Sequence, residues 1–113
     1  MVEIKTEDVD NIHFISVHGE IDAGSSIHLD NAFSAATENG HSKIAADLSG
    51  LTYISSAGLG VFVSYLDEFE QKEIKLVLFA VQEPVREVFD ILGLEKIISI
   101  LDSKEEAVRL LNE

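Results

Sequence analysis

Hydrophobic and polar residues alternate along the first twenty positions of the chain. The first run contains Val2, Ile4 and Thr6 between charged residues, and the second has Ile12, Phe14 and Ser16 alternating with His13, Ile15 and Val17. A period of two is typical of β-strands. Polar residues from Asp8 to Asn11 separate the two runs. The pattern therefore predicts an antiparallel hairpin that turns at residues 8–11.

Four later segments have the spacing of amphipathic helices, with apolar residues three or four positions apart. The first predicted helix begins at a cap, Ser25 or Ser26, and ends at Asn39-Gly40. The third begins at Glu83-Pro84 and ends before Gly93. The fourth follows a capping box at Ser103–Glu106. The expected inward residues are Leu29, Ala32, Phe33 and Ala36; Leu59, Phe62, Val63, Leu66 and Phe69; Val85, Val88, Phe89 and Leu92; and Ala107, Leu110 and Leu111.

Three short apolar runs, Ile44–Leu48, Ile74–Val81 and Ile97–Leu101, predict further strands between these helices. A strand, a helix and a second strand in succession favour a right-handed crossover with parallel strands. The element order is ββαβαβαβα. We expect an α/β fold in which residues 1–113 form a single domain, with a mixed β-sheet of about five strands and about four helices.

Charge and composition narrow the classes of partner. The 113 residues carry a net charge of −13 and contain no cysteine. So acidic a chain is unsuited to nucleic acid or anionic lipid, and a basic protein surface is its natural complement. The uncharged run 48–66 is long enough for a membrane span, but Ser, Thr, Tyr and Gly make it too polar. With no secretory signal at the start, we expect a cytoplasmic protein without membrane contact.

The segment 47–61 is the most unusual in composition. Two glycines, Gly58 and Gly60, fall in the first turn of the second helix, where each is less favourable than alanine by about 0.5–1 kcal/mol. Either tight packing within the fold or close approach by another molecule accounts for them. Ser55 and Ser56 precede that turn, and each is suited to capping the helix or to accepting a phosphoryl group. The positive end of the helix dipole would stabilise the added charge.

Several short motifs resemble the STAS domain of bacterial anti-sigma factor antagonists. They are Gly19-Glu20-Ile21-Asp22, Asp47-Leu48-Ser49 and the run from Tyr53 to Val61. The order of strands and helices matches that family over essentially the whole chain. In the family the phosphorylated serine lies three residues before the leucine of Gly-Leu-Gly, which is Ser56 here. Many members have aspartate just before it, whereas this chain has Ser55, the less favoured acceptor.

The resemblance implies a regulatory switch rather than an enzyme, with no cofactor. Unmodified protein would bind a GHKL-type serine kinase that is also an anti-sigma factor, phosphorylation would release it, and a PP2C-like phosphatase would restore it. The implied partner-binding residues are Asp22, Ser55, Ser56, Ala57, Gly58, Leu59 and Gly60. From the residues alone, Asp22 is equally suited to capping the first helix as a loop carboxylate. An adaptor that docks without phosphorylation, acting on a target such as secretion or biofilm control, is the alternative.

Other chemistries fit the sequence poorly. A nucleophile elbow requires glycine where Ile54 stands, and His13, His18, His28 and His41 have no convincing acid at a recognisable spacing. His13 and His18 are separated by an odd number of positions on a predicted strand, which places them on opposite faces and disfavours a metal site. Val63 replaces the third glycine of a dinucleotide motif, so we expect no bound nucleotide. The acidic run Asp67, Glu68 and Glu70 suits either a solvated helix face or a partner surface.

Overall fold

The computed structural model describes residues 2–113, and its elements follow the predicted order with one added 3-10 turn. The strands are β1 (Val2–Val9), β2 (Ile12–Ile21), β3 (Lys43–Ile54), β4 (Lys75–Phe79) and β5 (Ser99–Leu101). The helices are α1 (Ser26–Glu38), α2 (Ser56–Gln71), α3 (Glu83–Ile91) and α4 (Lys104–Leu111), with the 3-10 turn η1 at Leu94–Lys96.

The five strands form one mixed sheet in the order β1-β2-β3-β4-β5. β1 and β2 are antiparallel and pair from Val2↔Gly19 to Val9↔Ile12, while the other neighbours are parallel. Asp10 and Asn11 form the hairpin turn with positive φ angles of 52° and 69°. Aspartate and asparagine tolerate this left-handed conformation better than most residues, which explains why the turn falls there. The predicted hairpin and the parallel crossovers are thus confirmed.

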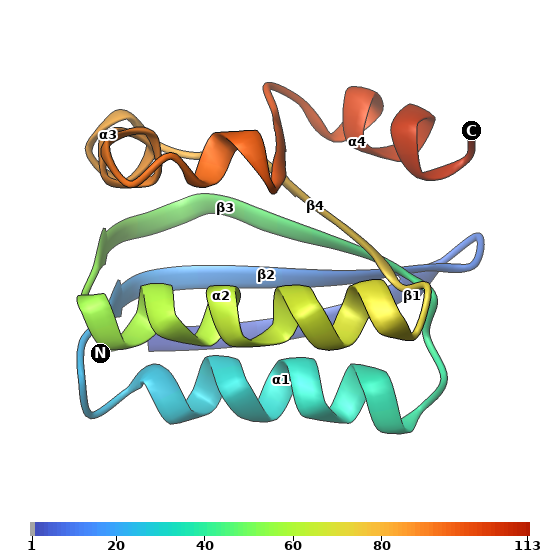
Figure 1. Cartoon of the computed structure of the whole chain (residues 1–113), viewed down its shortest axis with the longest axis horizontal. Coiled ribbons are helices and arrows are strands. Elements are labelled where there is room, and N and C mark those ends of the chain that lie inside the picture. The colour runs from blue at the N-terminus through green and yellow to red at the C-terminus, as the bar shows by residue number, and fades with distance from the viewer. Residues whose placement is uncertain (1) are drawn as a thin grey trace.

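Two hydrophobic clusters cover the two faces of the sheet. The larger joins α1, α2 and α3 to the sheet, and at its centre the ring of Phe33 meets that of Phe62 at 5.5 Å while Phe62 meets Phe89 at 5.7 Å. The smaller packs Ala107 and Leu111 of α4 against the other face. In Figure 1, α1 and α2 lie alongside each other across the strands and α4 lies away from them. The α2 helix is therefore anchored along its length.

Several boundaries differ from the sequence-based prediction, and the hairpin turn is confined to Asp10 and Asn11 because β1 continues to Val9. β3 does not end at Leu48 but continues to Ile54, because β2 runs beside it as far as the pair Ile21↔Ile54. Irregular register between β2 and β3 absorbs the small and polar residues of this stretch, which resembles a loop in the sequence. β4 and β5 are shorter than predicted, since Ile74 and Val81 lie outside β4 and Ile97 and Ile98 lie outside β5.

Three apolar residues that were expected in the core or in a strand are exposed. Val63 of α2 is 46% exposed, Leu92 after α3 is 57% exposed, and Ile97 before β5 is 63% exposed. The prediction that Val63 and Leu92 point inward was wrong. Helical spacing places a residue on a broad apolar stripe, but only the elements packed against that stripe decide which edge stays uncovered.

Across residues 2–113, no helix is both long enough and apolar enough to cross a membrane.

Candidate functional site

The candidate site lies where the parallel strands β2 and β3 end side by side. The backbone N–H of Ser55 donates to the carbonyl of Ile21 at 2.8 Å and holds the two strand ends together. Asp22 follows Ile21 directly, and Ser56 follows Ser55. Two motifs that are far apart in the sequence therefore meet at one edge of the sheet, the carboxyl edge where α/β folds place their sites.

The two serines at this edge have different environments. Ser55 is half-buried, has an extended backbone (φ −82°, ψ 170°), and its hydroxyl accepts a hydrogen bond from the N–H of Gly58 at 3.2 Å. It is the N-cap of α2. Ser56 is the first residue of the helix and is exposed, and no group within residues 2–113 hydrogen-bonds its hydroxyl. Ser55 thus caps the helix, and the hydroxyl of Ser56 is exposed to solvent.

The two glycines of the first turn serve different purposes. A Cβ at Gly58 would lie 2.7 Å from Cγ2 of Ile21 and 2.8 Å from Cγ1 of Ile54, so Gly58 is required by packing. A Cβ at Gly60 would meet no described atom within 4 Å beyond its own helix backbone and chain neighbours. Packing therefore explains Gly58 and leaves Gly60 unexplained.

The other predicted partner-binding residues are likewise either exposed or buried. Ala57 and Gly60 are exposed, whereas Gly58 is buried and Leu59 is only 7% exposed. Leu59 anchors the first turn in the core, and Ser56, Ala57 and Gly60 face outward.

Asp22 is exposed and is bound to the start of α1. Its Oδ1 accepts hydrogen bonds from the N–H and the Oγ–H of Ser25, each at 2.8 Å, and its own N–H donates to Ser25 Oγ at 2.9 Å. The Ser25 hydroxyl, followed by the Ser25 N–H, lowers the pKa of Asp22 below its ordinary value. Asp22 therefore holds Ser25, the N-cap residue of α1. It also carries a negative charge at the strand end next to Ser55 and Ser56.

The histidines do not form a catalytic pair with either serine. Within the described part of the chain, no histidine hydrogen-bonds to Ser55 or Ser56. His13 is buried near the opposite end of β2, and His18 is exposed and lies against Gly50. Among the described residues, neither serine therefore has a histidine in hydrogen-bond contact.

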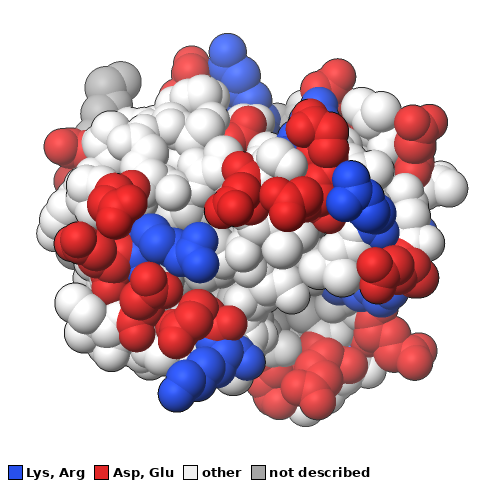
Figure 2. Space-filling view, turned by 90° about the horizontal axis from the view of Figure 1, so that it is seen from above, with Lys and Arg blue, Asp and Glu red and all other residues white. Residues whose placement is uncertain are grey.

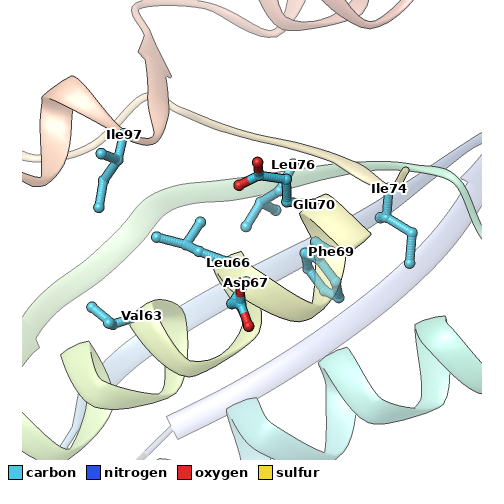
Figure 3. A pocket seen from close by; sticks show the side chains of 8 residues that line it. All are labelled: Val63, Leu66, Asp67, Phe69, Glu70, Ile74, Leu76 and Ile97. Carbon is cyan, nitrogen blue, oxygen red and sulfur yellow. The ribbon is translucent and has the colours of Figure 1, made fainter. Parts of the chain in front are cut away.

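An open apolar groove runs beside α2, which sequence reasoning did not foresee. It has a volume of about 480 Å³ and lies between α2, the start of β4 and Ile97 (Figure 3). Its apolar lining consists of Val63, Leu66, Phe69, Ile74, Leu76 and Ile97, and Asp67 and Glu70 add carboxylates. The exposed Val63 and Ile97 were the available signal, but their exposure depends on tertiary packing.

Carboxylates predominate among the charged side chains of the surface. Figure 2, viewed from above Figure 1, shows many Asp and Glu side chains and few Lys and Arg side chains on that face. The chain contains 21 acidic and 8 basic residues. The face shown therefore has an excess of negative charge.

The sequence and the fold of this chain are similar to those of known proteins. The STAS domain family matches residues 3–107. An anti-sigma-B factor antagonist from Listeria monocytogenes is 35% identical over 105 residues, covering 93% of this chain and 91% of that protein. An anti-sigma factor antagonist from Mycobacterium paratuberculosis superposes with a TM-score of 0.88 at 22% identity, covering 100% of this chain and 96% of that one.

Two structures of SpoIIAA also share the fold. The unphosphorylated anti-sigma factor antagonist SpoIIAA gives a TM-score of 0.82 at 23% identity, with 97% of this chain and 96% of that one covered. The phosphorylated form of the Bacillus protein gives 0.73 at 23% identity, with coverage of 95% and 97%. The family match and the Listeria relative extend over almost the whole sequence. The chain belongs to the STAS-domain family of anti-sigma factor antagonists.

Proposed function

We propose that this protein is a partner-switching regulator whose state is set by phosphorylation of Ser56. In the unmodified state it binds a GHKL-type serine kinase that acts as an anti-sigma factor, in the cytoplasm. The kinase transfers a phosphoryl group to Ser56 and the complex dissociates. A PP2C-like phosphatase then restores the binding-competent form.

The observation that carries this proposal is the difference between the two adjacent hydroxyls. The Ser55 hydroxyl caps α2 through Gly58, whereas the Ser56 hydroxyl is exposed at the first helical residue. A phosphate on Ser55 would remove the cap, but a phosphate on Ser56 would lie at the positive end of the helix dipole. Modification at Ser56 is therefore compatible with an intact fold.

Ser55 also accounts for the departure from the family pattern. Serine and aspartate are both strong N-cap residues, and each satisfies an N–H of the first turn through a side-chain oxygen. Replacing the usual aspartate by Ser55 keeps the cap and leaves Ser56 as the acceptor. The alignment of Ser56 with the glycines of the first turn is unchanged.

The proposed partner surface consists of Asp22, Ser56, Ala57 and Gly60, while Ser55, Gly58 and Leu59 position it. Asp22 follows the end of β2, whereas Ser56, Ala57 and Gly60 belong to the start of α2, which follows the adjacent end of β3. Among residues 2–113, no atom packs against the position of a Cβ at Gly60, so its missing side chain suits close approach by the partner. A phosphate adds a charge of about −1.5 to −2 to a surface that already carries Asp22. A loss of only about 1.4 kcal/mol weakens binding tenfold.

Phosphosite mapping tests the proposal. The purified protein is incubated with its GHKL-type kinase and ATP, and the phosphate is located by mass spectrometry in wild type, Ser56→Ala and Ser55→Ala. We expect phosphate on Ser56 in wild type and in Ser55→Ala, and none in Ser56→Ala. Tight binding with no phosphate anywhere would favour the constitutive adaptor. Phosphate on Ser55 alone would overturn the assignment of the acceptor.

A further inference from the structure

A second cluster of functional side chains lies at the opposite end of the sheet from Ser56. Asp8 of β1 is the register partner of His13 in β2, and His41 lies in the connection between α1 and β3. One ligand atom from each of the three residues lies within 4.8 Å of the other two. The cluster is assembled from three segments of the chain, so sequence spacing does not reveal it.

His13 is unusual in its burial. It is 7% exposed and is the one polar residue among the described positions that counts as buried. Its Nδ1 lies 2.5 Å from Oδ1 of Asp8, and its ring stacks on that of His41 with centroids 4.1 Å apart. Nε2 of His41 lies 3.7 Å from the same Asp8 oxygen. Two imidazole nitrogens thus approach one carboxylate oxygen.

We propose that Asp8, His13 and His41 bind a divalent transition-metal ion of the Zn²⁺ type. Two imidazoles and one carboxylate, with a position left for water, form a donor set that suits Zn²⁺. Four ligands at about 2.0–2.1 Å in a tetrahedron lie about 3.3 Å from one another. The two separations from Asp8 Oδ1, 2.5 Å and 3.7 Å, lie on either side of that value, and the ligand atoms of the two histidines lie within 4.8 Å of each other.

Small movements complete the coordination. The rings are nearly parallel, at 17°, so the half-buried His41 has to rotate to turn Nε2 toward the shared centre. The Asp8 side chain is 62% exposed and is free to move outward. The pocket beside them is also lined by Asp10 and Asn11, whose side chains carry oxygen atoms. Lys43 lines the same pocket, but its Nζ donates to Asn112 Oδ1 at 3.2 Å.

Electrostatics favour a dication at this place. The chain has a net charge of −13, and the ion would neutralise Asp8 and lower the repulsion from Asp10. Coordination would also tie the β1–β2 hairpin to the loop after α1, far from the carboxyl edge of β2 and β3. The site is therefore independent of phosphorylation at Ser56. His18, whose odd spacing from His13 disfavours a shared metal site, takes no part in this cluster.

Calorimetric titration with Zn²⁺ tests the proposal on the full chain after removal of any histidine tag. We expect one ion per chain with micromolar affinity, an increase in Tm, and changes in the imidazole NMR signals of His13 and His41. Asp8→Asn and His41→Gln should each weaken binding at least tenfold, and each keeps a polar side chain beside the buried His13. His28→Gln, at an exposed position of α1, is the matched control and should leave the affinity unchanged.

Three results would overturn the site. They are the absence of one-to-one binding in wild type, binding that survives His41→Gln, and an equal loss of affinity in His28→Gln. Each would leave Asp8 and His13 as a hydrogen-bonded pair with no metal function.

Discussion

The two ends of the parallel strands β2 and β3 differ in how their side chains are brought together. At the carboxyl end, each functional residue belongs to a short continuous motif, and one backbone bond from Ser55 to Ile21 joins the motifs. At the amino end, Asp8, His13 and His41 come from three segments. The first end is densely packed around Gly58, and the second opens into a pocket. Motif reasoning therefore points to candidate residues at the carboxyl end and misses the cluster of Asp8, His13 and His41 at the other.

The largest effect is expected from a larger side chain at Gly58, in the packed end. Gly58→Val places new atoms within 2.7 Å of Ile21 Cγ2, where neither adjacent strand end is free to move. We expect a loss of about 2–3 kcal/mol in the free energy of unfolding, typical of overpacking. Urea denaturation measures it. Gly60→Val is the matched control, and an equal loss there would show that helix propensity, not packing, is responsible.

Removing the helix cap should have a smaller effect. Ser55→Ala deletes the acceptor for the Gly58 N–H and is expected to lower the free energy of unfolding by about 1 kcal/mol. Ser56→Ala removes a hydroxyl with no described partner, so its stability should be nearly that of wild type. Denaturant titration of both variants distinguishes them. A Ser56→Ala variant that is less stable than Ser55→Ala would reverse the roles of the two serines.

Gly60→Ala separates folding from binding at the same end. The position is helical and has open space, so alanine should raise the free energy of unfolding by about 0.5–1 kcal/mol. Larger side chains should leave the fold intact and weaken the partner complex, because the proposed contact needs a flat surface. Thermal unfolding and a binding titration of Gly60→Leu check both parts. Unchanged partner affinity in Gly60→Leu would remove Gly60 from the interface.

The smallest effects concern the carboxylates at the two ends. Hydrogen bonding from Ser25 lowers the pKa of Asp22, and a hydrogen bond with His13 lowers the pKa of Asp8. A folded pKa below the unfolded value, about 3.9, means stability that is present above that pH and is lost as the pH falls through the folded pKa.

Carbon NMR titration of the two side chains measures these values. Ser25→Ala should return the pKa of Asp22 toward its ordinary range and leave that of Asp8 unchanged. If the pKa of Asp22 were unaffected, the hydroxyl contact would not be its cause.

The sequence was sufficient for the order of elements, the hairpin and the serine motif, because these depend on local periodicity and neighbouring residues. It was insufficient for the end of β3, since Ser49 to Ile54 extend as a strand only through pairing with β2. It also misplaced Val63 and Leu92, whose exposure depends on which elements cover them. The roles of Gly58 and Gly60 could be separated only when Ile21 and Ile54 were placed in space.

The proposal that phosphorylation of Ser56 controls binding is tested most directly by measuring the affinity of the kinase partner for two forms of the protein. One form is unmodified, and the other carries phosphoserine incorporated at position 56. We predict at least a tenfold weaker complex for the phosphorylated form, with no such loss when the phosphoserine is placed instead at the exposed Ser42, near the opposite end of the sheet. Equal affinities for the unmodified protein and the protein phosphorylated at Ser56 would contradict the account.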